Sequence, residues 1–290
     1  MIIMALQESN YKGFIPTLWS ARLLNHLDTK LVALNFVNRE YEGDISAYGD
    51  TVKINSIGPV TIKEYTGADI DAPEELTAVQ QELKIDQGRY FNFHVKDVDQ
   101  AQANVALLDA ATQRAAYDMA DHIDKDVFTV MANEAGIKVG TASSPLDVTS
   151  EDVDIYNVIA DVSAQMDAEN IPSSGRVLVV PAFVIAALNK HPLFNRNDNV
   201  VANGFSGTIL GIQIYVSNNL KATSTYVAGV LGLPEATAFA NQVVETEAYR
   251  PERNFSDAVK GLQVYGRSVI EPNKLAVVYF KKPGSGTTGA

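Results

Sequence analysis

The amino-acid sequence predicts an α+β fold, and three observations lead to this prediction. One helical stretch runs without interruption through residues 97–136. Alternating apolar and polar residues, which are typical of β-strands, occupy residues 41–96 and return after residue 243. Between these parts, residues 146–242 mix short helical and strand patterns. We therefore expect a long helix with extended strands on either side of it in the chain.

Residues 1–43 are predicted to form an N-terminal arm. Thr17 or Ser20 is suited to open a short helix that ends near Lys30. Trp19 is the only tryptophan of the chain. It either anchors a core within the chain or belongs to an arm whose aromatic side chain docks on another molecule, and the sequence leaves both interpretations open.

Residues 44–96 are predicted to form a long β-hairpin. Its outgoing half alternates at Val52 and Ile54, and its returning half at Phe91 and Phe93. The turn-prone tip between the halves carries the acidic residues Asp69, Asp71, Glu74 and Glu75. Because an isolated two-stranded ribbon is marginally stable in water and has open edges, we expect the hairpin to lie on another surface.

The helical stretch 97–136 is predicted to be the spine of the fold. Asp97 and Gln100 match a capping box, and Gly136 suits the C-terminal end. No Pro or Gly interrupts the stretch, so the helix would span roughly 55 Å. A coiled coil is the alternative interpretation, but the apolar stripe is rich in alanine and lacks a Leu or Ile heptad.

Residues 146–242 are predicted to form a mixed α/β region that follows a hinge rich in small residues. Thr149 or Ser150 is expected to cap a helix, and Pro181 to begin another helix that continues to Leu188. Strands are expected over residues 176–180, 208–216, 226–231 and 236–241.

Residues 243–290 are predicted to contain strands and turns only. Strands are expected over residues 243–246, 258–265 and 275–280, and Gly266 is expected to break the second of them. These strands need a partner, and the apolar face of the spine helix is the largest surface left unpaired. The last residues, 284–289, are flexible by composition.

The composition argues against a dedicated nucleic-acid-binding protein. The formal net charge is −12 and the pI about 4.8, whereas affinity for nucleic acid comes from neutralising phosphates. There is no cysteine, which excludes disulfides and thiolate metal sites. No signal-peptide pattern and no apolar run of membrane-spanning length is visible, so we expect a soluble protein made inside the cell.

Candidate active sites are weak. Asp118, His122 and Asp126 share a helix face at a spacing that permits metal binding, but a solvated acidic face is favoured because no second cluster completes a coordination sphere. Ser206 lies in a Gly-Phe-Ser-Gly sequence that resembles a nucleophile elbow, with the second Gly one position too early. We therefore assign no catalytic, cofactor-binding or metal-binding residue and no cofactor, and we predict that the protein is not an enzyme.

Several local sequences carry a resemblance to one known family. Residues 38–43 followed by residues 49–54 resemble the opening of an extended loop in that family. Residues 176–181, placed before a helix, and residues 207–218 resemble its axial region, and residues 259–279 resemble its closing peripheral strands. Together they resemble the major capsid protein of tailed bacteriophages, the Hong Kong 97-type capsid fold family, over nearly the whole chain.

The resemblance implies a division of the chain into five parts. The expected parts are an N-terminal arm (1–43), an extended β-hairpin loop (44–96), a peripheral domain with the spine helix (97–145), an inserted α/β axial domain (146–242), and peripheral return strands with a flexible tail (243–290). In this arrangement the hairpin lies over the adjacent subunit, the arm clasps another subunit, and the axial domain faces the capsomer axis.

The resemblance also implies a function and partners. Copies of the chain would form pentamers and hexamers of an icosahedral shell around double-stranded DNA, which they would not bind sequence-specifically. The protein would reside in the virion capsid after assembly in the host cell cytoplasm, without contact to a membrane. Because the chain starts almost directly at the arm, a separate scaffolding protein is expected, and portal and decoration proteins are further candidate partners.

Charged residues at the hairpin tip and near the return strands are the candidate assembly contacts. We expect the acidic tip to pair with basic residues of a neighbouring subunit, and the arm to contribute its tryptophan. The candidate contact residues are Trp19, Asp69, Asp71, Glu74, Glu75, Arg250, Arg253 and Lys260.

Three other functions are weighed against a viral shell. An encapsulin-like nanocompartment would use the same fold to enclose protein cargo, and the sequence separates it poorly from a capsid. A hydrolase would use the loop around Ser206 or the acidic residues. A tail or other virion structural protein would form tubes or rings instead of closed shells.

Overall fold

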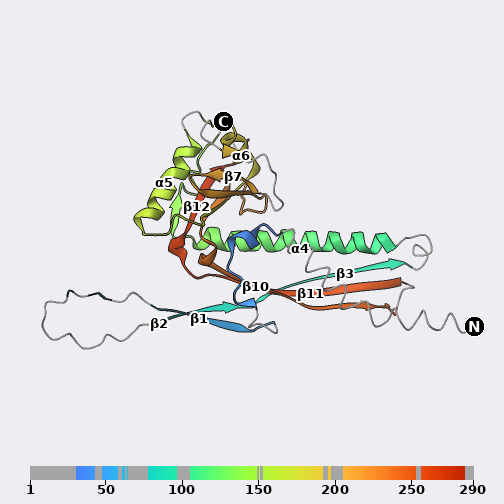
Figure 1. Cartoon of the computed structure of the whole chain (residues 1–290). Helices are drawn as coiled ribbons and strands as arrows, with labels where there is room; N and C mark the ends of the chain where they lie inside the picture. Colours follow the sequence, from blue (N-terminus) through green and yellow to red (C-terminus); the bar gives the residue numbers. More distant parts are fainter. Residues whose placement is uncertain are drawn as a thin grey trace, which may run out of the picture.

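The fold is seen in a computed structural model. It describes residues 31–42, 48–57, 61–62, 64, 78–96, 105–148, 150, 153–191, 195–196, 205–252 and 256–284. The long helix α4 (Val105–Glu134) crosses the middle of the molecule, a compact sheet with two helices lies on one side of it, and long strands lie on the other (Figure 1). The expectations for residues 1–30 and for the acidic hairpin tip fall outside the described residues.

Helix α4 lies within the helical stretch predicted over residues 97–136. It has 30 residues, which corresponds to about 45 Å, and the predicted capping box at residues 97–100 lies outside the described part. The helix ends just before Gly136, whose N–H donates to the carbonyl oxygen of Pro272 at 2.8 Å. A Cβ at Gly136 would lie only 2.8 Å from that oxygen, so the chain can turn here only with glycine.

The compact part is a seven-stranded mixed sheet in the order β4-β12-β9-β5-β8-β7-β6. Its strands are β4 (Ile137–Val139), β5 (Val177–Val180), β6 (Asn195–Arg196), β7 (Phe205–Ile209), β8 (Ile212–Val216), β9 (Tyr226–Gly232) and β12 (Leu275–Lys281). Helices α5 (Ile155–Ala168) and α6 (Ala182–Leu188) belong to the same part. Short 3-10 turns lie at Ala33–Phe36 (η1), Pro234–Ala236 (η3) and Pro272–Lys274 (η4).

Strand β12 shows how this sheet is buried on both faces. Leu275 and Val277 join the core that contains α4, whereas the alternating Ala276 and Val278 join the core that contains α5 and α6. We expected residues 275–280 among the strands that return to the spine. The strand does contact the core of α4, but it is paired within the compact sheet, between β4 and β9.

Two local predictions for the compact part are wrong in detail. Residues 208–216 were expected to form one strand, but a two-residue turn at Leu210 and Gly211 divides them between β7 and β8. The cap of α5 is Asp154, whose carboxylate accepts the N–H of Tyr156 at 2.9 Å, and neither of the predicted residues Thr149 or Ser150 holds this position.

A buried arginine closes the turn after α5. The guanidinium of Arg176 is 1% exposed and donates to the carbonyl oxygens of Pro172, Ile171 and Ser163 at 2.9, 2.7 and 3.2 Å. It also donates to the hydroxyl of Ser163 and to the carboxylate of Asp167. These bonds satisfy backbone groups at the end of the helix that would otherwise lose their hydrogen-bond partners.

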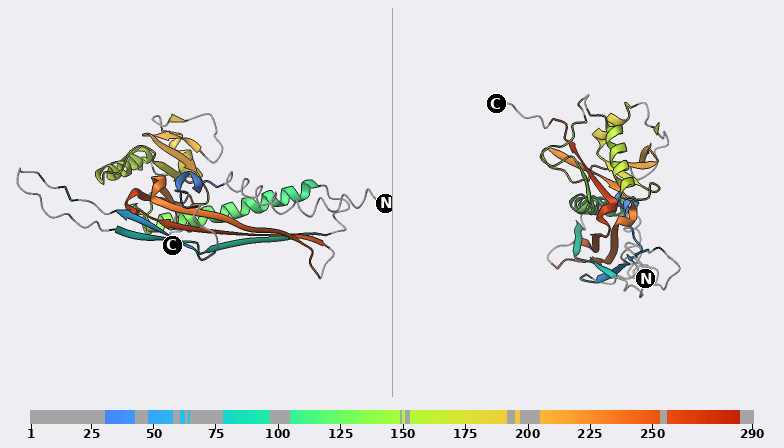
Figure 2. Two further views of the ribbon diagram at one scale, coloured as in Figure 1. Left: turned by 60° about the horizontal axis from the view of Figure 1, so that its bottom comes forward. Right: turned by 90° about the vertical axis from the view of Figure 1, so that its left-hand side faces the viewer.

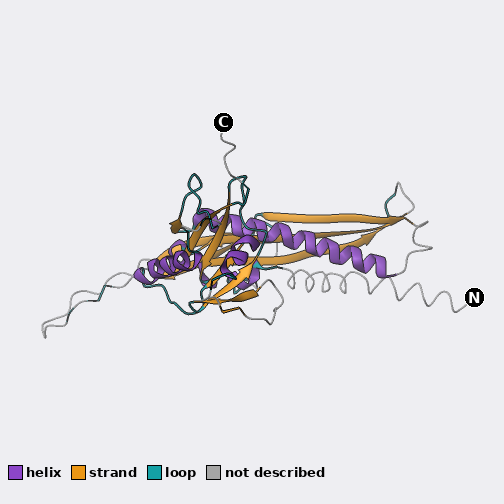
Figure 3. Cartoon of the chain, turned by 90° about the horizontal axis from the view of Figure 1, so that it is seen from above, coloured by secondary structure: helices purple, strands orange, loops and turns teal. Residues whose placement is uncertain are grey.

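The long strands form a separate three-stranded antiparallel sheet in the order β10-β11-β3. It consists of β3 (Gln87–Lys96), β10 (Thr237–Tyr249) and β11 (Ser256–Val269). These strands run beside α4 when the molecule is viewed from above (Figure 3). The predicted strand 258–265 packs on the long helix, because Tyr265 shares the core of α4, and Phe239 of β10, which was expected in the axial region, joins the same core.

Strand β3 corrects the predicted hairpin. Phe91 and Phe93 were expected on its returning half, but β3 pairs with β11, and Phe93 lies opposite Val259. The actual hairpin consists of β1 (Thr51–Ile57) and β2 (Ala78–Lys84). It leaves the body at one end of the long sheet, as two further views show (Figure 2).

The base of the hairpin packs on the face of the long sheet that points away from α4. Leu83 and Ile85 form a small core with Ala240 and Val264 of β10 and β11. Gly266 was predicted to break its strand, yet β11 continues through it. A Cβ at this glycine would lie within 2.4 Å of the carbonyl oxygen of Lys84, so glycine permits the close approach of the hairpin.

Candidate assembly surfaces

The residues expected to make assembly contacts are only partly within the described structure. Trp19, Asp69, Asp71, Glu74, Glu75 and Arg253 lie outside it. Arg250 is exposed directly after β10. Lys260 is exposed on β11, where its ammonium group lies 2.7 Å from Glu247 and 5.2 Å from the centre of the Tyr249 ring. The structure therefore gives Lys260 an acidic partner in its own chain.

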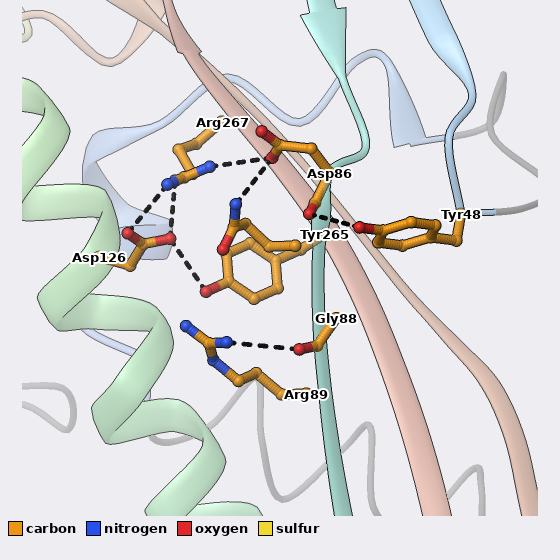
Figure 4. Close-up of polar contacts among 8 residues, drawn as sticks. Tyr48, Asp86, Gly88, Arg89, Asp126, Tyr265 and Arg267 are labelled. Atoms are coloured by element: carbon orange, nitrogen blue, oxygen red, sulfur yellow. Dashed lines mark hydrogen bonds and ion pairs between the residues drawn. The ribbon is translucent and has the colours of Figure 1, made fainter.

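An ionic junction joins the hairpin base, the long sheet and α4 (Figure 4). The guanidinium of Arg267 on β11 lies 2.7 and 3.0 Å from the two carboxylate oxygens of Asp126 on α4. Its Nη1 also lies 3.0 Å from the carboxylate of Asp86, in the turn between β2 and β3. One side chain thus holds three elements that are distant in sequence.

Two tyrosines extend this junction. The hydroxyl of Tyr265 donates to Asp126 at 3.0 Å, and Tyr48 donates to the carbonyl oxygen of Asp86 at 3.1 Å. Burial, followed by the negative charge of Asp126, raises the pKa of Tyr265 above its ordinary value of 10.0. The phenol therefore stays protonated and remains a hydrogen-bond donor to the carboxylate.

The junction changes the interpretation of the acidic residues on α4. We expected Asp118, His122 and Asp126 to form a solvated face. Asp118 is exposed and pairs with Arg114 on the same helix, but the side chain of Asp126 is only 22% exposed and belongs to the junction. Sequence reasoning missed its partner because Arg267 lies 141 positions away in the chain.

A second buried carboxylate fixes the start of the described chain on α4. Asp124 is 1% exposed and accepts the backbone N–H groups of Val32 and Ala33 at 3.1 and 3.0 Å. Burial raises its pKa from 3.8 to about 6, although the two N–H groups act in the opposite direction. Leu31 and Phe36 on either side of this contact are fully buried in the core of α4. Residues 31–36 are therefore fixed at a defined point on the helix.

The outer edge of the long sheet is open to further contacts. Among the described strands, none pairs with the outer edge of β3. A groove of about 680 Å³ lies between this strand and α4. Its lining consists of Arg89, Tyr90, Phe91, Asn92, Phe93, His94, Ala111, Arg114, Ala115, Asp118, Met119 and His122. An unpaired edge beside an apolar groove is suited to receive a chain segment from another molecule.

Several large apolar side chains are exposed on the described surface. Tyr90 is 80% exposed and lies opposite Leu262 of the neighbouring strand, which is also exposed. Ile62, which follows β1 in the hairpin, is 95% exposed. Large apolar side chains on long strands are more typical of surfaces that are covered in an assembly than of a free monomer.

The described residues offer little for other chemistry. They contain no group of three or more His, Asp or Glu residues arranged to hold a metal ion. No helix among them has the length and apolar character needed to cross a membrane. Ser206 lies within β7, whereas a nucleophile elbow requires a sharp turn from a strand into a helix.

Comparison with known proteins identifies the family. The family model described as phage capsid protein matches residues 78–279, which include α4, both large sheets and the Arg267 junction. The chain belongs to the phage capsid protein family. A search among curated proteins found no match to this capsid protein.

Solved structures of viral particles share this fold. A chain of Mycobacterium phage Che8 is 29% identical to this capsid protein with a TM-score of 0.68, and the match covers 86% of this chain and 90% of that chain. The capsid structure of the cyanophage P-SCSP1u matches at 15% identity and a TM-score of 0.63, covering 85% and 86%. A virus-like particle from Pyrococcus furiosus matches at 14% identity and a TM-score of 0.58, covering 91% and 99%.

These findings confirm the predicted family and α+β capsid fold. The protein is a structural shell protein, a major capsid protein of a bacteriophage, that assembles with itself into a capsid. The identity to the particle from Pyrococcus furiosus is low enough that the likeness shows only a shared fold. A nanocompartment shell is therefore less well supported than a viral capsid.

Proposed function

We propose that this capsid protein forms pentamers and hexamers, which close into an icosahedral shell around double-stranded DNA in the host cytoplasm. The β1–β2 hairpin is the observation that carries this proposal. Among its described residues, those of the base share a core with Ala240 and Val264, while Ile62 farther out is 95% exposed. A two-stranded ribbon is marginally stable alone, so its outer part needs a neighbouring molecule.

The parts of the chain would take the following roles. The hairpin crosses onto an adjacent subunit, and the Arg267 junction sets the direction in which it leaves the body. Strand β3 belongs to the long sheet and offers its open edge and groove to a neighbour. The arm before residue 31 reaches another subunit from its fixed point at Asp124. The compact part, which consists of the seven-stranded sheet with α5 and α6, faces the capsomer axis, whereas residues 237–242 of the predicted axial region 146–242 belong to β10 of the long sheet.

The acidic hairpin tip is proposed to pair with basic residues of the neighbour. In the structure Lys260 already pairs with Glu247, and both side chains are about half exposed. Such an exposed pair contributes little free energy, so an incoming carboxylate can share the ammonium group at small cost. Many weak contacts of this kind are enough to hold a closed shell together, because each subunit is bound by several neighbours at once and the contacts act jointly.

The enclosed genome would be packed without tight binding. The net charge of −12 disfavours strong attraction to phosphates, which suits a container for densely packed DNA. A scaffolding protein, a portal and decoration proteins are the further partners expected in this assembly. Nuclease-protected double-stranded DNA inside purified particles would support the viral role, and an enzyme in its place would favour a nanocompartment.

Charge reversal at the tip tests the assembly contact. We expect Glu74→Lys combined with Glu75→Lys to lower the yield of closed particles, measured by sedimentation and negative-stain electron microscopy. Asp161→Lys with Glu169→Lys is the matched control, because it makes the same charge change at an exposed position of α5 and at the exposed residue that follows the helix. If the tip variant forms as many particles as the wild type, the proposed contact is rejected. If the wild type forms neither particles nor rings even when a candidate scaffolding protein is co-expressed, the assembly itself is rejected.

A further inference from the structure

The turn between β7 and β8 has an unusual residue at its tip. Ile209 and Ile212 lie opposite each other, so Leu210 and Gly211 are the only residues of the loop. Their φ angles are 50° and 79°, and two positive values are the pattern of a type I′ turn. Such turns favour Asn-Gly or Asp-Gly, since a leucine side chain crowds the backbone in the left-handed region.

The leucine is not explained by the core of its own subunit. Among the described residues, the only other non-glycine residue with positive φ is Asn170, a type that adopts this conformation readily. The flanking Ile209 and Ile212 are buried, but Leu210 is 50% exposed. A Cβ built on the adjacent Gly211 would meet nothing within 4 Å, which shows that the tip projects into open space.

The chemistry around the turn indicates what covers it. No charged residue occurs between residues 199 and 220, although the chain as a whole has a net charge of −12. Copies of one acidic chain repel each other over most of their surface and approach most easily where charge is absent. Exposed Thr208 and Gln213 surround the apolar tip with uncharged polar groups, as at the rim of a protein interface.

We propose that Leu210 is an apolar contact residue between copies of this chain, held on a strained turn so that its side chain inserts into a neighbouring subunit. This proposal rests on the proposed assembly into capsomers. It places the contact on the compact part of the molecule, across α4 from the long strands (Figure 1). The strained turn gives Leu210 no contact with the core of its own subunit. The benefit that offsets the strain is therefore a contact of the exposed leucine side chain with another molecule.

The test compares two substitutions at the same position. Leu210→Asn suits the turn and removes the apolar side chain, whereas Leu210→Met keeps an apolar side chain on the same backbone. We expect Leu210→Asn to leave the Tm of unassembled subunits unchanged or raised and to lower the particle yield at least about tenfold, because the loss recurs in every subunit contact. Leu210→Met should keep more than about half of the wild-type yield.

Each outcome decides between the proposal and its alternatives. A Leu210→Asn variant that assembles like the wild type would show that the leucine makes no contact between copies. A lowered Tm for this variant would overturn the argument from backbone strain. A wild-type chain that forms neither particles nor rings, even with a candidate scaffolding protein present, would instead overturn the proposed assembly, and the contact with it.

Discussion

Replacing Arg267 with methionine removes the cation that joins the hairpin base to α4 but keeps most of the aliphatic side chain. The side chains of Arg267 and Asp126 are 15% and 22% exposed, and two guanidinium nitrogens lie 2.7 and 3.0 Å from the two carboxylate oxygens, so the pair is close to a buried ion pair. Breaking a fully buried ion pair lowers the free energy of unfolding by about 3–5 kcal/mol. Because both side chains are partly exposed, we expect a loss of about 2–3 kcal/mol for Arg267→Met. Asp86 is 57% exposed, and its bond adds at most about 1 kcal/mol.

Urea unfolding of unassembled subunits, followed by circular dichroism, measures this loss. Arg114→Met is the matched control, because it breaks an exposed pair with Asp118 within α4 and should cost about 0.3–0.5 kcal/mol. The double variant with Asp126→Asn should lose less than the sum of the single variants, since both remove the same pair. A loss for Arg267→Met no larger than that of Arg114→Met, or strictly additive losses, would refute the role of the junction.

Two further predictions concern buried charges. Arg176→Met should lower the free energy of unfolding by about 3 kcal/mol, because several hydrogen bonds of a fully buried guanidinium are lost at once; a loss below about 1 kcal/mol in urea unfolding would contradict this. Asp124 has a pKa of about 6 in the folded chain, whereas the ordinary value of an aspartate, expected in the unfolded chain, is 3.8. The folded chain therefore binds this proton more readily, and the stability that protonation adds is lost as the pH rises through 6. Between pH 7 and pH 5 the wild type should therefore gain about 1 kcal/mol of unfolding free energy relative to Asp124→Asn, and equal pH dependence of the two proteins would show that this carboxyl does not titrate there.

The spine helix and most strands were predictable because their signals are local. Apolar residues three and four positions apart define the buried face of α4 from Met119 to Val127, and alternation defines β3 and β11. The family resemblance also came from local sequences, such as residues 176–181 before α6. A pattern of this kind depends on a few neighbouring residues, so it survives in one sequence without any knowledge of distant contacts.

The partners of these elements were not predictable in the same way. Alternation at Phe91 and Phe93 shows that a strand forms, but it does not show whether the strand pairs with the hairpin or with β11. The role of Gly266 was not predictable for the same reason. It was expected to break the strand, but it lies within β11 and leaves room for the backbone of Lys84, which is distant in the sequence. Asp126 looked like one member of a solvated face until Arg267 was placed beside it.

For this capsid protein, local spacing in the sequence determined the helix and the strands, the composition determined the acidic character, and the resemblance of local sequences indicated the family. Only the tertiary structure decided which strands share a sheet, which carboxylates are buried and where the hairpin is fixed. The physical reason is that a helix or strand depends on residues within a few positions, whereas pairing, burial and ionic contacts join residues such as Asp86 and Arg267, 181 positions apart. Whether a charged side chain is solvated or held in a junction is a property of those distant contacts.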